Sequence, residues 1–230
     1  MKIICTICMR GGSKNIPNKN LKKINGKPLL YYTINQAIKS KVFNVVMVST
    51  DSKKIFNYSK KYGAKVWFLR PKKLSTDKAP KLFAIKHALN ESEKKFKTKF
   101  DIIFNLHVTS PLRTISDIKN ALKQFLKEGN NQLITVSSSN RNPYFNMIEK
   151  KNKKIYLVKK LKKNISRRQD APKVFDMNAS IYIWKREFLI KTKKIINPKT
   201  SIYLMPKERS VDVDDEFDLG IVRNYLKQNK

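Results

Sequence analysis

Short apolar runs alternate along the chain with segments in which apolar residues recur every three or four positions. The runs are bounded by polar residues, glycine or proline, as expected of buried strands. They occupy residues 3–8, 45–49, 65–69, 101–106 and 133–136. Helical spacing appears between them, at Leu30, Ile34 and Ile38 and again at Leu82, Ile85 and Leu89. This alternation predicts an α/β fold, doubly wound around a mostly parallel sheet.

The amino-acid composition changes between residues 138 and 173. Asn, Ser and Pro cluster at 138–143, and a lysine-rich stretch at 153–158 has the composition of exposed strands. The chain then returns to the sheet, where alternation puts Ile181 and Ile183 on one face. We therefore expect a single domain over residues 1–230, from which the segment 138–173 protrudes.

The first apolar run leads directly into a basic loop at residues 10–20, which reads Arg-Gly-Gly-Ser-Lys-Asn-Ile-Pro-Asn-Lys-Asn. A glycine-containing loop at the carboxyl end of a parallel strand offers backbone N–H donors, and Arg10, Lys14 and Lys19 add positive charge. No Gly-Lys-Ser/Thr closes the loop, so it is not a Walker A motif, and it is not G-x-G-x-x-G. The loop predicts a cradle for a polyphosphate.

An acidic segment near the end of the sequence contrasts with the rest of the chain, which holds only 17 Asp and Glu residues. If residues 211–213 are extended, Asp212 and Asp214 project to the same side, as two ligands of a divalent cation would. Magnesium suits such a pair because it completes its shell with water and substrate phosphates. The alternative is a helix start, with Asp214, Asp215 and Glu216 against the helix dipole. Both can hold at once.

The formal net charge of +34 raises nucleic acid as a partner. The lysines are spread through every segment, however, which favours a solvated surface that attracts anionic substrates over a specific nucleic-acid site. The two cysteines, Cys5 and Cys8, fall three apart in the first predicted strand and point to opposite faces, which favours core residues over a metal or disulfide pair. The sequence contains no apolar run of eighteen residues and no signal peptide, so we expect a cytoplasmic protein without a membrane span.

Several motifs together resemble the CMP-sialic acid synthetases, the cytidylyltransferases that activate acylneuraminate and related nonulosonic acids. The resemblance rests on Arg-Gly-Gly-Ser-Lys at residue 10, Ile-Pro at residue 16, Lys-Asn-Leu at residue 19 and Gly-Lys-Pro-Leu at residue 26. It continues in order with Val-Ser-Thr-Asp at residue 48, Thr-Ser-Pro-Leu-Arg at residue 109 and Asp-Val-Asp at residue 212. The resemblance implies transfer of CMP from CTP to an acidic nine-carbon sugar, with Mg²⁺ as cofactor and a homodimer formed through the protruding segment.

The resemblance also implies a set of site residues. Those expected to bind the nucleotide are Arg10, Gly11, Gly12, Ser13, Lys14, Lys19, Asn20, Arg70 and Lys81. Those expected to contact the sugar acid are His107, Arg168 and Asn178, and the metal ligands are Asp212 and Asp214.

Individual residues remain open to simpler interpretations. Arg70 fits a surface cation as well as a phosphate ligand, Asp51 fits a helix cap, and Arg113 fits a structural partner of a carboxylate. Where many relatives have Gln, this chain has His107, which makes it the first candidate for substrate discrimination. Arg168 suits a carboxylate because its guanidinium can donate two parallel hydrogen bonds.

In the implied reaction, the anomeric hydroxyl attacks the α-phosphorus of CTP. Arg10, Lys14, Lys19 and Asp212 form the catalytic set, in which the three cations and the metal stabilise charge on the departing pyrophosphate. A metal-bound hydroxide or Asp212 fits the general base. The alternatives are a CMP-legionaminate or other ulosonic acid synthetase, a nucleic-acid-binding protein, and a sugar-nucleotide sensor without catalysis.

Overall fold

A six-stranded sheet forms the centre of the molecule in the computed structural model, which describes residues 1–13, 15–162 and 165–228. Its strands stand in the order β10-β6-β9-β5-β1-β4, and every strand except β9 runs in the same direction. Their bounds are β1 Ile3–Cys8, β4 Val45–Ser49, β5 Ile102–Leu106, β6 Gln132–Ser138, β9 Phe175–Lys185 and β10 Thr200–Leu204. The predicted mostly parallel α/β fold is confirmed.

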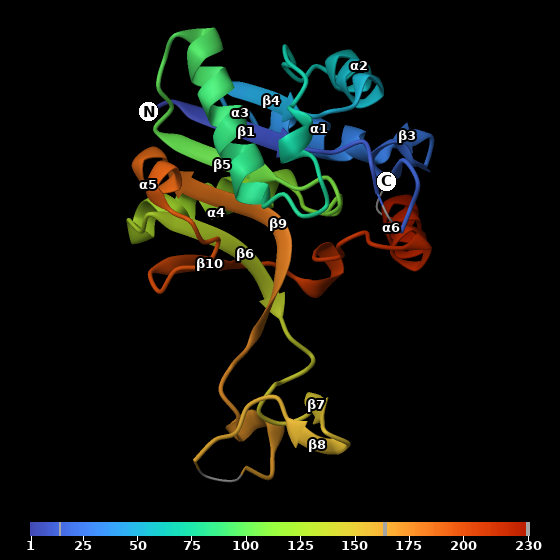
Figure 1. The fold of residues 1–230 in the computed structure, drawn as a ribbon, viewed down its shortest axis with the longest axis vertical. Coiled ribbons are helices and arrows are strands. Elements are labelled where there is room, and N and C mark those ends of the chain that lie inside the picture. Colours follow the sequence, from blue (N-terminus) through green and yellow to red (C-terminus); the bar gives the residue numbers. More distant parts are fainter. Residues whose placement is uncertain (14, 163–164, 229–230) are drawn as a thin grey trace.

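Helices cover both faces of this sheet and give three layers (Figure 1). One face packs against α1 (Leu29–Ser40), α2 (Lys53–Lys61), α4 (Ile115–Glu128) and α6 (Glu216–Gln228). The other packs against α3 (Lys81–Phe96) and α5 (Arg186–Lys191). Strand β9 contributes to both cores, because Ile181 and Ile183 face the first while Tyr182 and Trp184 face the second. None of the helices among the described residues is long and apolar enough to cross a membrane.

The predicted strand at 65–69 is wrong. Only Lys65 joins the sheet, through a single parallel bridge to Met47 beside β4. Beyond it the backbone crosses the carboxyl end of the sheet, where the Arg70 N–H donates to the Thr50 carbonyl at 2.7 Å. The aromatic rings of Trp67 and Phe68 pack against α3 rather than continuing a strand. A short apolar run alone cannot distinguish these two outcomes.

Short elements shape the ends of the sheet. The hairpin of β2 (Lys23–Ile24) and β3 (Lys27–Pro28) turns at Asn25 and Gly26, both with positive φ, as a two-residue hairpin requires. The 3₁₀ turns are η1 Lys19–Leu21, η2 Lys72–Leu74, η3 Arg168–Asp170 and η4 Lys207–Arg209. Ser52, not Asp51, caps α2 by accepting the Ile55 N–H, so the predicted capping role of Asp51 is wrong.

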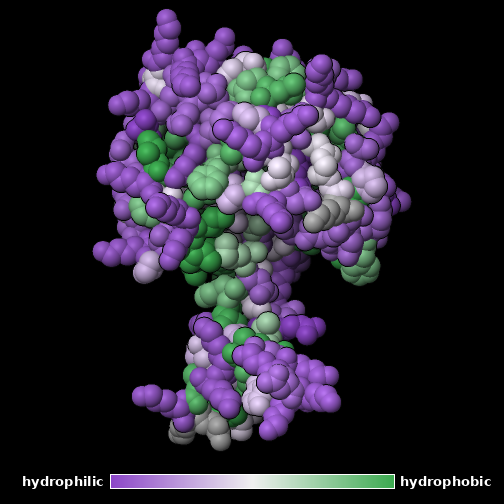
Figure 2. All heavy atoms as spheres, viewed as in Figure 1, coloured by the Kyte–Doolittle hydropathy of each residue, from purple (hydrophilic) through white to green (hydrophobic). Residues whose placement is uncertain are grey.

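The segment between β6 and β9 extends away from the sheet (Figure 1). It carries the antiparallel pair β7 (Ile148–Lys151) and β8 (Lys154–Leu157). Large apolar side chains on this pair are exposed, among them Ile148, Ile155 and Val158 just beyond β8. Figure 2 shows apolar atoms gathered on this segment and its neck, whereas the body is covered mostly by hydrophilic residues.

A buried carboxylate anchors the chain just before its acidic segment. Asp117 is 1% exposed and accepts two hydrogen bonds from Arg209, at 2.8 and 3.0 Å, besides closing a capping box with Thr114 at the start of α4. Its pKa is lowered because the hydrogen bonds and charge of Arg209 and the bonds from Thr114 outweigh its burial, which acts in the opposite direction. Asp117 therefore ties η4, and the residues that follow it, to α4.

Replacing Asp117 by Asn should lower the free energy of unfolding at pH 7 by about 2–4 kcal/mol, since Arg209 and the cap lose an ionised partner. A lowered folded-state pKa stabilises the protein above the unfolded pKa, and this stability disappears as the pH falls through the folded pKa. Urea unfolding from pH 7 to pH 3 should therefore show a shallower acid loss in the variant. The matched control is exposed Asp176→Asn, and equal behaviour of the two variants would contradict the proposed anchor.

Candidate active site

A cavity of about 380 Å³ opens at the carboxyl ends of β1 and β5. Its wall is formed by the basic loop that follows β1, by residues 107–109 after β5, by Lys81 at the start of α3 and by Asp214 ahead of α6. In an open sheet of parallel strands, this is the edge at which ligands bind. The wall combines cations, a carboxylate and the backbone of a glycine-containing loop, as expected for a charged ligand with phosphate groups.

The basic loop is held against the neighbouring strand end through its backbone. The Gly11 N–H donates to the Asp51 carboxylate at 2.9 Å, and a Cβ at Gly11 would lie 3.0 Å from the Ser52 Cβ. Gly11 is therefore needed for close approach. Asn20 steadies the loop from its other end by donating to the Arg10 carbonyl at 2.9 Å. Gly12 faces the cavity, where added side-chain atoms would meet nothing within 4 Å.

Lys19 joins the basic loop to the acidic segment. Its Nζ donates to the Val213 carbonyl at 2.7 Å and to the Asp214 Oδ1 at 3.1 Å. The Lys19 side chain is 13% exposed, whereas that of Asp214 is 70% exposed. The preceding Asn18 has φ 54°, a left-handed conformation that Asn tolerates better than most residues. The two charged segments expected to surround one phosphate ligand thus meet in space.

Asp212 lies deeper than Asp214. Burial and the nearby charge of Asp214 raise the pKa of Asp212, whereas a hydrogen bond with Thr109 and the charge of Lys19 act to lower it. Its Oδ1 is buried without a hydrogen-bond partner among the described residues. A hard divalent cation would supply that missing partner and offset the repulsion between the two carboxylates, so this pair fits such an ion.

The chain would provide few ligands to this ion. Within residues 1–13, 15–162 and 165–228, no three His, Cys, Asp or Glu side chains group as a complete protein site would require. Cytidylyltransferases of this kind generally use a divalent metal. One or two carboxylates with substrate and water ligands match the way magnesium is usually bound.

Lys81 and His107 meet at the wall of the cavity, where Lys81 Nζ contacts His107 Nε2. Burial, helped by the charges of Arg113 and Arg70, lowers the pKa of Lys81 to about 7, although Cys8 and Asp212 act in the opposite direction. Burial and the charges of Lys81 and Arg113 lower the pKa of His107 well below its usual value. The pair therefore carries less charge near pH 7 than the residue types suggest.

Arg70 is buried, so the interpretation as a surface cation is wrong. Its guanidinium donates to the carbonyls of Met9 and Ser49, at 2.9 and 3.2 Å, and to the Ser75 hydroxyl at 2.9 Å. It ties together the ends of β1 and β4 and lines a smaller cavity of about 220 Å³ that shares Arg10 and Lys81 with the main one. Arg70 can therefore support a nucleotide site by holding the ends of β1 and β4 in place.

Arg113 is also structural: among the described residues its hydrogen bonds go to carbonyl and hydroxyl oxygens, while the nearby charge of Asp117 favours its charged form. It is buried and donates to the carbonyls of Ser180 and His107, at 2.8 and 2.6 Å, and to the Thr33 hydroxyl at 2.6 Å. Burial lowers its pKa to about 10. Arg113 therefore fixes the backbone of His107 beneath the cavity.

Two further predicted residues, Asn178 and Arg168, do not line the cavity. Asn178 is buried, with its side chain bonded to Thr135, Ser180 and Ser210, so the predicted direct contact with sugar does not fit its surroundings. Arg168 is exposed on the protruding segment and donates to the Ser139 carbonyl at 2.7 Å. Lys14 lies outside the described residues, so its expected role in the loop stays a prediction.

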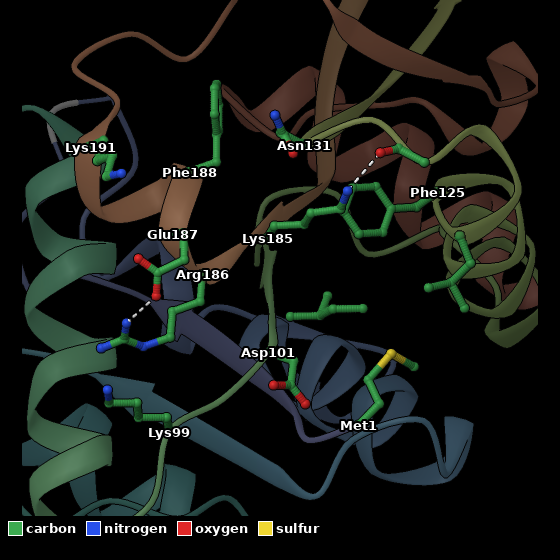
Figure 3. Close-up of a pocket in the computed structure, with 13 residues that line it drawn as sticks. Met1, Lys99, Asp101, Phe125, Asn131, Lys185, Arg186, Glu187, Phe188 and Lys191 are labelled. Carbon is green, nitrogen blue, oxygen red and sulfur yellow. Dashed lines mark hydrogen bonds and ion pairs between the residues drawn. The ribbon is translucent and has the colours of Figure 1, made fainter.

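A larger cavity, of about 670 Å³, lies near the opposite ends of β1 and β5 (Figure 3). It is lined by apolar residues such as Phe125 and Phe188, and two of its four cations have partners: Lys185 bonds the Gly129 carbonyl and Arg186 pairs with Glu187. No basic loop or paired carboxylates face it among the described residues. Size alone therefore does not identify the active site.

The fold and site define a nucleotidyltransferase of the α/β type. The family model described as Cytidylyltransferase matches residues 4–219, and the chain belongs to that family. The chain is 43% identical over 221 residues to CMP-N,N'-diacetyllegionaminic acid synthase of Campylobacter jejuni, covering 96% of this chain and 93% of that protein. It is 42% identical over 227 residues to the post-translational flagellin modification protein B of Campylobacter coli, covering 99% and 96%.

A solved structure has the same fold. It is that of CMP:2-keto-3-deoxy-manno-octonic acid synthetase complexed with CTP, with a TM-score of 0.75, 16% identity and complete coverage of both chains. The predicted family and enzyme class, a nucleotidyltransferase, are thus confirmed.

Replacing Lys19 by Met should lower kcat/KM for nucleotidyl transfer about 10–100-fold, because one charge-assisted contact between the loop and the acidic segment is worth about 1.5–3 kcal/mol. Lys22→Met is the matched control, since Lys22 pairs with Glu216 at the surface outside the cavity. Steady-state kinetics of both variants would measure this, with circular dichroism to verify folding. Equal activity of both would contradict the role of Lys19.

Proposed function

We propose that this cytidylyltransferase joins CTP to a nonulosonic acid, giving the CMP-sugar and pyrophosphate. The observation that carries the proposal is the contact between the basic loop and the acidic segment at Lys19 and Asp214 inside a cavity at the carboxyl edge of the sheet. One triphosphate with a divalent cation would satisfy both segments. The fold neighbour complexed with CTP supports the nucleotide.

The acceptor we propose is a legionaminate-type acid, the alternative to acylneuraminate in the sequence interpretation. The relative named for legionaminic acid is similar over nearly the whole chain, at 43% identity. His107 lies at the cavity, where an imidazole in place of an amide would change the hydrogen bonds offered to acceptor hydroxyls.

Mg²⁺ is the metal we propose for Asp212 and Asp214. It would act as a Lewis acid that neutralises phosphate charge. Arg10, Lys14 and Lys19 would hold the triphosphate and stabilise the charge that grows on the oxygen leaving with pyrophosphate. Asn20 would keep Arg10 in place through its hydrogen bond to the Arg10 carbonyl. Gly12 and Ser13 would let the phosphates approach the backbone, and Arg70 would brace the nucleotide side of the site.

We further propose that the protein acts as a homodimer. The exposed apolar side chains on β7 and β8 support a contact with a second copy through the protruding segment. Arg168 belongs to the same segment, and in a dimer it would be available to the carboxylate of a sugar held by the other subunit. The cytoplasm is the proposed location, because nucleoside triphosphates are made and used there.

The function can be tested by pyrophosphate release from CTP and Mg²⁺ with a panel of nine-carbon and eight-carbon keto acids. A legionaminate-type acid should give the highest kcat/KM, exceeding N-acetylneuraminate by about 10-fold or more, a difference of about 1.4 kcal/mol in transition-state binding. Asp212→Asn should reduce release about 100-fold or more, while Asp176→Asn should leave it unchanged. Release that is equal with and without any acid would contradict the proposal.

The dimer can be tested at the apolar surface of the protruding segment. Ile155→Lys together with Val158→Lys should shift the sedimentation coefficient from dimer to monomer, because two charges would be buried in the contact. The double variant Lys94→Ala, Lys95→Ala on α3 serves as a surface control. A wild-type protein that sediments as a monomer at micromolar concentration would contradict this proposal.

A further inference from the structure

We propose that Lys81, held in place by His107, is the general base that accepts the proton from the attacking hydroxyl of the acceptor. This inference rests on the proposed function and assigns a step that the sequence left to Asp212 or to a metal-bound hydroxide. It starts from a contact between two basic side chains inside the active-site cavity, where a pair of cations would repel each other.

The fold holds the pair rigidly. The backbone of His107 donates to the Ser180 carbonyl at 3.2 Å, and its own carbonyl accepts from Arg113 at 2.6 Å and from Thr33 at 3.2 Å. Its ring lies against Tyr182, with centroids 5.2 Å apart. His107 therefore presents Nε2 to Lys81 from a fixed position.

Lys81 is positioned to lose its proton at physiological pH. It is the first residue of α3, after Pro80, where the positive end of the helix dipole disfavours a cation. Burial disfavours the ammonium further, and its pKa falls to about 7. A lysine that is partly neutral at pH 7 is suited to take up a proton, which an ordinary surface lysine with a pKa near 10.5 is not.

Titratable and charged groups from several parts of the chain act on Lys81. Cys8 ends β1, and Arg70 and Arg113 carry the positive charges that favour the neutral amine. Cys8 and Asp212 oppose the arginines, but no ion pair within 4.0 Å is found between Lys81 and Asp212 among the described residues. Lys81 lines both the main cavity and the smaller one beside Arg70.

The proposed step balances without another reactant. The anomeric oxygen of the acceptor forms a bond to the α-phosphorus of CTP while its proton passes to the neutral amine of Lys81. The bond from the α-phosphorus to the bridging oxygen breaks, and its electron pair leaves with pyrophosphate. Lys81 then carries one extra proton, which it returns to water after product release.

The decisive test compares Lys81→Arg, Lys81→Met and the exposed control Lys78→Met in pyrophosphate release across pH 5.5–9.5. Wild-type kcat/KM should fall about tenfold per pH unit below a midpoint near 7, because protonated Lys81 cannot accept a proton. In both Lys81 variants kcat should be lower by about 10²–10⁴-fold. The decline of kcat/KM below pH 7, the acid limb of the profile, should also disappear. Lys78→Met should retain the wild-type profile.

The arginine variant separates a base from a binding cation. If Lys81 only attracted phosphate or carboxylate, Arg would restore activity and Met would weaken CTP binding in calorimetry. Either result would overturn the inference, as would an unchanged acid limb. The expected result is near-normal CTP affinity in both variants, which also shows that they fold.

His107→Gln provides a second readout. Removing the ring opens Lys81 to water, so the acid limb should move to higher pH while CTP affinity stays near normal; an unmoved limb would overturn the role of His107. Failure of the inference differs from failure of the proposed function: an active wild type with an active Lys81→Arg variant overturns only the inference. A wild type that releases no pyrophosphate with any acid overturns both.

Discussion

The shape of the cavity depends on one contact, in which the ammonium of Lys19 bonds Val213 and Asp214. These two residues lie 194 and 195 positions further along the chain. From the loop that follows β1, Lys19 bonds the Val213 carbonyl and the Asp214 carboxylate, just before α6. Without it, the loop and the acidic segment would be separate patches of opposite charge. With it, the cations of the basic loop and the Asp214 carboxylate line one cavity at one edge of the sheet.

Burial gives the residues of this cavity properties that their types do not suggest. Asp212 binds protons more readily than a solvated carboxylate, while Lys81 and His107 bind them less readily. The guanidinium groups of Arg70 and Arg113 donate hydrogen bonds to backbone carbonyls near the strand ends. The fold thus uses these two arginines to position the backbone around the cavity.

The protruding segment has a different physical character from the body. Its β7–β8 pair is too small to bury its own apolar side chains, several of which face solvent. The body instead encloses two cores, one on each face of the sheet, and covers itself with charge. The protruding segment and the body therefore differ in how much apolar surface they leave exposed.

The sequence by itself determined the layers, the loops at the strand ends and the motifs, because hydrophobic periodicity and the order of the motifs can be read directly from the residues. It misjudged residues 65–69, Asp51 and Asn178, whose positions depend on neighbours distant in sequence. Only the tertiary structure brought Lys81 against His107 and buried Arg70, since contact and desolvation arise from packing. The residue type sets the ordinary pKa of a side chain, but burial and neighbouring charges decide whether that side chain is protonated near pH 7.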